Sequence, residues 1–140
     1  MEILLLHKVF KNVELFRKPK SYKMSFKFEN LRIWQLSMDY AEGIYNISEK
    51  FPKSEIYNLT SQIRRAVDSI ALNIAEGSIL QSSLENKRFL GYSIRSLAEV
   101  VTCLYKADRR KYIDNECFKI NYDQAYLLMN MMISYRSKIK

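Results

Sequence analysis

Glycine and proline are scarce in this chain, and their scarcity limits the folds that it can adopt. Three glycines and two prolines occur among 140 residues. Strand-rich folds need many tight turns, and those turns depend on residues of this kind. Between the few breaks, apolar residues recur every three or four positions, which favours helices. The length suits one domain that buries a core without disulfides or metal.

Four helical segments are predicted from the apolar pattern. Segments of about 20–28 residues correspond to roughly 30–40 Å of helix. Matched lengths and short connections indicate an all-α, antiparallel up-down-up-down four-helix bundle. The predicted segments are residues 30–50, residues 54–76, a third from 82 to about 109–111, and a fourth from 114 or 115 to near the end.

Capping residues suggest where these helices begin and end. Asn30 and Ser54 can accept from the free N–H groups at the starts of the first two helices. Ser82 and Glu85 are spaced as a capping box at the start of the third. Gly77 can take the left-handed conformation that ends the second helix.

The first and fourth helices carry more apolar residues than one bundle face requires. A second apolar stripe beside the first must be buried against something or remain exposed to solvent. Closed homo-oligomers, in which copies of the chain bury such stripes against one another, are the commonest solution. We therefore expect copies of the chain to associate. In the first helix, the expected seam is Leu31, Trp34, Met38, Ala41, Tyr45 and Ser48, and the second stripe is Ile33, Leu36, Tyr40, Ile44 and Ile47. In the fourth helix, the expected seam is Phe118, Tyr122, Ala125, Met129 and Met132.

Residues 1–23 differ from the rest of the chain. They are weakly periodic, are interrupted by Pro19, and carry half of the net charge of +8. One interpretation is a poorly ordered basic extension that lies upstream of a natural start at Met24. The alternative is a flexible basic arm that binds a partner. On either interpretation, the expected bundle comprises residues 24–140.

Little catalytic chemistry is available in the sequence. The single histidine, His7, lies in the N-terminal segment. The bundle therefore cannot assemble Glu-x-x-His metal motifs or a Ser-His-Asp triad. Cys103 and Cys117 form no Cys-x-x-Cys motif and are expected to be reduced in a cytoplasmic protein. No window reaches the roughly 18 apolar residues that span a membrane. We expect no enzymatic activity, metal, cofactor, membrane contact or small-molecule substrate.

A polar stripe on the second helix is the first candidate site. Its residues follow a 3-4-4-3 spacing, which places them on one helical face beside the apolar one. They form either a solvated surface or a buried network that sets the register between helices or subunits. The residues are Gln62, Arg65, Ser69, Asn73 and Glu76.

Basic residues gather in two places, on the third helix, where Arg88 and Arg95 share a face, and at its end; together they are the second candidate site. Nucleic-acid phosphates bind Lys and Arg on an accessible surface, and nearby tyrosines can stack on bases. The alternative is ordinary surface charge that complements the helix dipole. The residues are Lys87, Arg88, Arg95, Arg109, Arg110 and Lys111, with Tyr92, Tyr105 and Tyr112 as stacking candidates.

Several short motifs together resemble a known family. They include Phe28-Glu29-Asn30-Leu31 with Trp34-Gln35, the run from Leu59 to Ala66, and Asn73-Ile74-Ala75-Glu76-Gly77. This pattern, over about residues 26–140, resembles the four-helix bundle proteins of the ribosomal-RNA intervening-sequence family.

The resemblance implies a non-enzymatic bundle that assembles into a pentamer. A protein of similar fold, the accessory protein of diversity-generating retroelements, associates with nucleic acid and a reverse transcriptase. We therefore expect a self-associating scaffold that binds RNA or a nucleic-acid-associated protein. The alternative is a module that docks a different protein without nucleic acid. Family members often carry glycine just before the tyrosine that opens the turn into the fourth helix. In this chain, Lys111 stands in that position before Tyr112.

Overall fold

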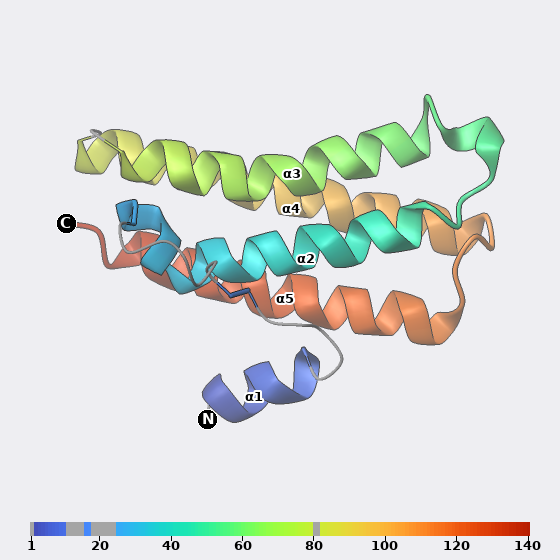
Figure 1. Ribbon diagram of the computed structural model, residues 1–140, viewed down its shortest axis with the longest axis horizontal. Coiled ribbons are helices and arrows are strands. Elements are labelled where there is room, and N and C mark those ends of the chain that lie inside the picture. The colour runs from blue at the N-terminus through green and yellow to red at the C-terminus, as the bar shows by residue number, and fades with distance from the viewer. Residues whose placement is uncertain (1, 11–15, 18–24, 80–81) are drawn as a thin grey trace.

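Four long helices lie side by side in the computed structural model (Figure 1). The structure describes residues 2–10, 16–17, 25–79 and 82–140, and these form an all-α four-helix bundle. A short helix and two 3-10 turns complete the described elements. The bundle helices are α2 (Arg32–Ser48), α3 (Leu59–Ser78), α4 (Ser83–Arg109) and α5 (Asn115–Ser137). The short elements are α1 (Glu2–Val9), η1 (Lys27–Asn30) and η2 (Lys53–Glu55).

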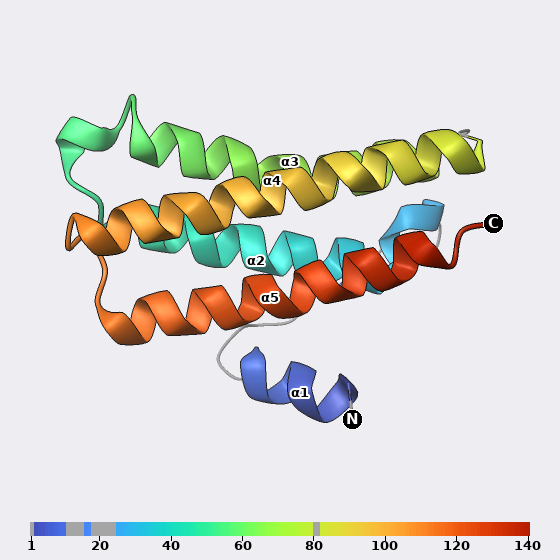
Figure 2. The ribbon, with the colours of Figure 1, turned by 180° about the vertical axis from the view of Figure 1, so that it is seen from behind.

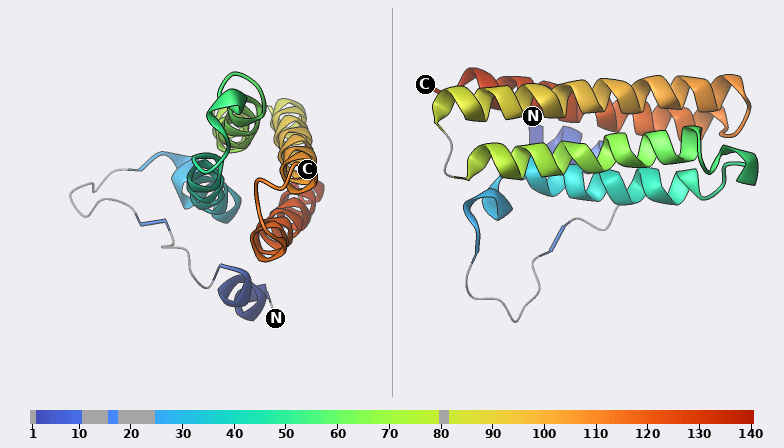
Figure 3. Two further views of the ribbon diagram at one scale, coloured as in Figure 1. Left: turned by 90° about the vertical axis from the view of Figure 1, so that its right-hand side faces the viewer. Right: turned by 90° about the horizontal axis from the view of Figure 1, so that it is seen from above.

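Successive bundle helices run in opposite directions, as the sequence predicts. α3 packs on α2 and α4, and α5 packs on α4 and α2, so the four helices form a closed ring of neighbours. Figure 3 shows this ring end-on, with α1 outside it. Figure 2, from behind, shows α1 beside α5.

The core of α3 is a single apolar stripe, whereas the core of α2 comes mainly from the stripe that was not expected to form the seam. Leu36, Tyr40 and Ile44, from the expected second stripe of α2, are buried. Trp34 and Met38, from the expected seam, are only half-buried. Both stripes repeat every three or four residues, so periodicity alone could not decide between them. The buried α3 stripe consists of Leu59, Ile63, Ala66, Ile70 and Ile74.

The first two helices do not begin at the predicted caps. Asn30 lies in η1, and Leu31 takes the N-cap position of α2 without a side-chain hydrogen bond. Ser54 lies in η2 and is exposed. Short 3-10 turns therefore precede both helices, where the sequence predicted that the helices would already have begun.

The Glu55 side chain caps the start of α3. The Glu55 carboxylate accepts from the Leu59 backbone N–H at 3.0 Å. It also accepts from the Tyr112 hydroxyl at 3.1 Å and lies 3.5 Å from Arg110. The hydrogen bond from Leu59 is the main reason that the pKa of Glu55 is lowered. Asn58 also donates to Glu55 at 3.0 Å, and Tyr112 and Arg110 reach it from the α4–α5 connection. The cap is therefore Glu55, one residue after the predicted Ser54.

The caps of α4 and α5 agree better with the sequence. The Ser82 hydroxyl accepts from the Glu85 N–H at 3.2 Å. Glu85 itself pairs with Arg88 at 3.2 Å, so only one side of the expected capping box is formed. At the start of α5, the Asp114 carboxylate accepts from the Cys117 N–H at 2.8 Å.

Gly77 does not end α3 in a left-handed conformation. It lies inside the helix, is buried, and has a negative φ. A Cβ added to Gly77 would lie 2.7 Å from the Cβ of Phe89 on α4. The close approach of the two helices therefore explains the glycine, and the prediction of a C-cap was wrong.

Lys111 closes α4 in a left-handed conformation with φ of 60°. The Tyr112 N–H donates to the Ala107 carbonyl, and the Lys111 N–H donates to the Asp108 carbonyl, both at 2.9 Å. These bonds form a Schellman motif, in which glycine is the preferred residue at the position of Lys111.

The N-terminal residues contact the bundle. α1 packs on α5, and Phe10 is buried with the core residues. Whether residues 1–23 belong to the natural protein, and whether they are poorly ordered, stays a prediction.

We predict that Gly77→Ala destabilises the bundle by about 1–2 kcal/mol, because overpacking against Phe89 exceeds the gain in helix propensity. Gly43→Ala is the matched control, because an added Cβ meets nothing within 4 Å there. We expect the control to stabilise the bundle by about 0.5–1 kcal/mol. Urea unfolding followed by circular dichroism measures both changes, and equal stabilisation of both variants would contradict the packing argument.

We predict that Lys111→Gly stabilises the protein by about 1 kcal/mol, because glycine adopts the left-handed conformation without strain. Lys106→Gly removes the same charge from a regular turn of α4 and should destabilise by about 1 kcal/mol. Thermal unfolding of both variants measures the difference. A lower melting temperature for Lys111→Gly would show that the left-handed conformation carries no strain.

Candidate interaction surfaces

The polar stripe of α3 lies along the contact with α4. The hydroxyl oxygens of Ser69 and Ser96 are 2.6 Å apart, and Ser69 also lies 2.8 Å from the Ala66 carbonyl oxygen. A hydroxyl has one proton, so if Ser69 donates to the carbonyl it accepts from Ser96. Asn73 donates to the Ser69 carbonyl at 2.8 Å. The bond between Ser69 and Ser96 connects α3 with α4 within one chain, and the other two lie within α3.

The other members of the polar stripe lie further from the helix contact. Gln62 is half-buried, whereas Arg65 and Glu76 are exposed. Arg65 and Glu76 are about 16 Å apart along the helix axis, so they cannot pair with each other. The structure therefore divides the stripe into an inner part at α4 and an outer part in contact with solvent.

The six basic candidates do not form one patch. Arg88 and Arg95 are exposed on the outward side of α4, two turns apart. Arg109 lies at the other end of α4, roughly 20–30 Å away along the axis. Arg110 is engaged with Glu55 at 3.5 Å, and Lys111 forms the helix end.

Lys87 faces a different direction from Arg88. Its side chain is half-buried, and its carbonyl accepts from the Arg136 side chain of α5 at 2.8 Å. The sequence predicts one shared face for Arg88 and Arg95 only. Because consecutive residues on a helix point about 100° apart, the half-buried Lys87 and the exposed Arg88 lie on different faces of α4.

An apolar groove runs along the outer side of α4 and α5. Its volume is about 240 Å³. Tyr126 beside it has 62% of its surface exposed, and Tyr105 and Ile133 are also exposed. Its lining residues are Ala98, Val101, Tyr122, Ala125, Tyr126 and Met129. We call this surface, with Tyr105 and Ile133, the α4–α5 groove.

Aromatic rings continue this groove toward the start of α5. The Tyr105 ring lies 4.9 Å from Phe118 and 6.3 Å from Tyr122, centre to centre. Phe118 and Tyr122 stack at 5.7 Å. The sequence assigned Phe118, Tyr122 and Met129 to the bundle seam, but they are half-buried at its outer edge. The excess of apolar residues on the fourth helix was the signal for this groove.

The apolar side chains of α2 outside the core are partly covered by the same chain. Trp34 packs against Phe16 and Phe28, with ring centres 5.0 and 5.1 Å apart. The Arg64 guanidinium lies 4.1 Å from the centre of the Tyr45 ring. The α4–α5 groove is therefore a more open apolar surface than the outer side of α2.

The described titratable groups give no sign of a nucleophile or a metal centre. Burial raises the pKa of both cysteine thiols, Cys103 and Cys117, which keeps them protonated and weakly nucleophilic. Burial also raises the pKa of Asp39. Over the residues that the structure describes, no three His, Cys, Asp or Glu side chains are grouped to hold a metal ion. The side chain of His7 lies outside the described part.

Residues 29–134 match the sequence model of the 23S rRNA-intervening sequence proteins. The chain belongs to this family. The match covers the whole of α2, α3 and α4 and most of α5. It begins after the N-terminal residues that contact α2 and α5, so these lie outside the family pattern.

A solved structure has a similar fold. It is a protein of unknown function from the S23 ribosomal protein family of Bacteroides thetaiotaomicron. The two share 24% identity with a TM-score of 0.68, and the similarity covers 76% of this chain and 99% of the other. At this identity the likeness establishes the fold only. No curated protein matches the sequence significantly. The relation to the retroelement accessory protein stays a prediction.

No described helix is both long and apolar enough to cross a membrane. A cytoplasmic location also stays a prediction.

Proposed function

We propose that this member of the family is a non-enzymatic scaffold that associates with copies of itself through the α4–α5 groove. The exposed aromatic surface of the groove is the observation that carries the proposal. Interface cores are enriched in tyrosine and methionine, which supply apolar area and adaptable packing. Tyr122, Tyr126 and Met129 provide this composition on one face.

Self-association is preferred over binding to a different protein. Every copy of the chain carries the same apolar groove, so two copies can bury their grooves against each other without another protein. Symmetric homo-oligomers are the commonest assemblies of this kind. A pentamer is the assembly that the family resemblance implies. If the purified chain is monomeric, the groove instead becomes a docking surface for another protein.

We predict that Tyr126→Asp with Ile133→Asp weakens self-association about a hundredfold, because carboxylates would be buried at the contact. Leu72→Asp is the matched control, since Leu72 is an equally exposed apolar residue on α3. Sedimentation velocity of the full chain measures the assemblies. A monomeric wild-type chain, or equal loss in the control, would overturn the proposal.

RNA binding is a second candidate function, favoured by the outward side of α4. Arg88 and Arg95 are exposed there two turns apart, and the exposed Tyr92 lies between them along the helix. Arginine contacts phosphates, and tyrosine stacks on unpaired bases. Glu85 partly neutralises Arg88 through the 3.2 Å ion pair. A scaffold that repeats this surface in several copies would bind RNA more tightly than one copy does.

We predict that Arg88→Ala with Arg95→Ala weakens binding to a short single-stranded RNA and lowers the slope of log affinity against log salt by about 1.4. Lys53→Ala with Lys138→Ala is the control, because it removes the same charge from the ends of the bundle. Fluorescence anisotropy at several salt concentrations measures both. No binding by the wild-type chain at low salt would exclude this function.

A further inference from the structure

The C-terminal end of α1 is anchored on the bundle. Phe10, which follows the helix, is 4% exposed and packs within the hydrophobic core. Gln124 of α5 is buried and donates from Nε2 to the Val9 carbonyl at 3.1 Å. Losing this bond would leave a buried amide without a partner, which is costly. α1 therefore forms a wall beside α5, held in place at its last turn.

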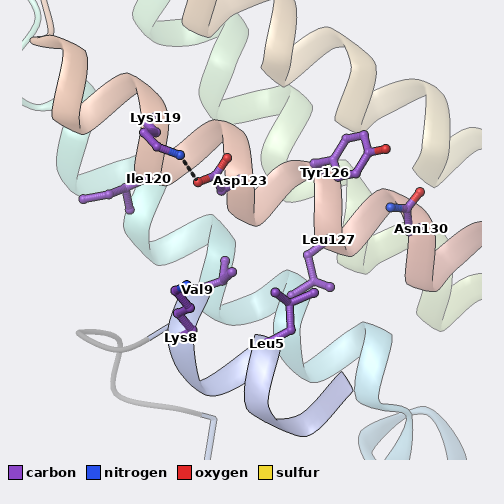
Figure 4. A pocket seen from close by; sticks show the side chains of 9 residues that line it. All are labelled: Leu5, Lys8, Val9, Lys119, Ile120, Asp123, Tyr126, Leu127 and Asn130. Atoms are coloured by element: carbon purple, nitrogen blue, oxygen red, sulfur yellow. Dashed lines mark hydrogen bonds and ion pairs between the residues drawn. The ribbon is translucent and has the colours of Figure 1, made fainter. Parts of the chain in front are cut away.

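A cavity of about 600 Å³ lies between α1 and α5 (Figure 4). Pockets that bind small molecules have volumes of roughly 300–1,000 Å³. Leu5 and Val9 of α1 line one side, and Ile120 and Leu127 of α5 line the other. Aliphatic walls of this kind suit a hydrocarbon chain, whereas a base or a sugar would need hydrogen-bond partners for its polar groups.

Charged side chains gather at the end of the cavity where α1 finishes. Figure 4 shows Lys8 of α1 and Lys119 of α5 at this end, with Asp123 beside Lys119. The Lys119 ammonium lies 2.8 Å from the Asp123 carboxylate, and the two side chains are 75% and 44% exposed. An exposed pair of this kind contributes little, so Lys119 can turn toward another anion.

Lys8 supplies the second positive charge of the cavity. It is exposed, and it makes no ion pair within the described ranges 2–10, 16–17, 25–79 and 82–140. Two lysines and one aspartate leave this end of the cavity with a net charge of +1. The opposite end, at Tyr126 and Asn130, carries no charged side chain. The cavity thus combines apolar walls with a positive charge at one end only.

We propose that this cavity binds a free anionic amphiphile, namely a monocarboxylate with an alkyl chain of medium length. The chain lies between Leu5, Val9 and Leu127, and the ammonium groups of Lys8 and Lys119 hold the carboxylate. α1 has eight residues and extends about 12 Å along its axis, which limits the length of chain that it can cover. A single carboxylate balances the net charge of +1, whereas a phosphate monoester carries nearly twice that charge.

The proposed ligand site is separate from the α4–α5 groove. The two share Tyr126, but the residues that contact the chain and the carboxylate do not line the groove. The lining residues from α1 also lie outside residues 29–134, which match the family. The site is therefore built partly from a segment that the family pattern does not include, and it does not depend on self-association.

We predict that Lys8→Ala with Lys119→Ala weakens the binding of decanoate about tenfold, because both groups that attract the carboxylate are removed. Isothermal titration calorimetry of the full chain, below the concentration at which decanoate forms micelles, measures the dissociation constant. Lys53→Ala with Lys138→Ala removes the same charge from the ends of the bundle and should bind decanoate like the wild type. Equal weakening in both double variants would show that only the total charge matters and would overturn the proposal.

A cationic ligand tests the sign of the charge that the cavity selects. Decylamine has the same alkyl chain with a positive head group. We expect the wild-type chain to bind it at least about tenfold more weakly than decanoate, because the ammonium would meet Lys8 and Lys119. Equal affinities would show apolar partitioning without a carboxylate site and would overturn the proposal.

Filling the cavity tests where the chain lies. Ile120 is 44% exposed and Leu5 is 48% exposed, so Ile120→Trp and Leu5→Trp each occupy the cavity without entering the core, and both should abolish decanoate binding. Leu72→Trp, at a 59% exposed residue of α3, is the matched control. Circular dichroism checks that the variants are folded. Undiminished binding to a folded Ile120→Trp or Leu5→Trp variant, or no binding by the wild-type chain, would rule the site out.

Discussion

Close contact between α3 and α4 is the constraint on which the other packing depends. Gly77 and the small side chains of Ser69, Ser93 and Ser96 let the two backbones approach. The Ser93 hydroxyl donates to the Ile70 carbonyl at 2.8 Å and binds the pair directly. Gly77 leaves room at this contact for the Phe89 side chain of α4. The outer sides of α2 and α5 carry further apolar side chains that lie outside the four-helix core, such as Trp34 and Tyr126.

The chain deals with this excess surface in two ways. On α2, its own residues cover the apolar side chains, as when Phe16 and Phe28 pack on Trp34. On α5, the N-terminal helix covers Leu127, but Tyr126 and Ile133 stay exposed beside α4. Apolar area exposed in one contiguous groove is a typical feature of a contact surface. The proposed scaffold function follows from this uneven distribution, and not from any catalytic group.

Contacts that the local pattern does not reveal explain several of the corrected predictions. Glu55 caps α3 through the Leu59 N–H, while Tyr112 and Arg110 contact its other carboxylate oxygen. The sequence around Ser54 does not indicate that side chains more than fifty positions away contact this segment. The sequence predicted a helix end at Gly77, and the position of Phe89 shows that the glycine allows a close contact between helices instead. The basic residues between positions 87 and 111 lie at both ends and on different faces of α4.

The sequence by itself determined the four helices, their order and the antiparallel bundle, because apolar periodicity and sparse helix breakers are local properties. It also indicated an excess of apolar surface on the first and fourth helices. Only the tertiary structure decided which stripe of α2 enters the core, which apolar side chains stay open, and what the N-terminal residues cover. Those outcomes depend on which helices become neighbours, and two stripes of equal period look alike until a neighbour buries one of them.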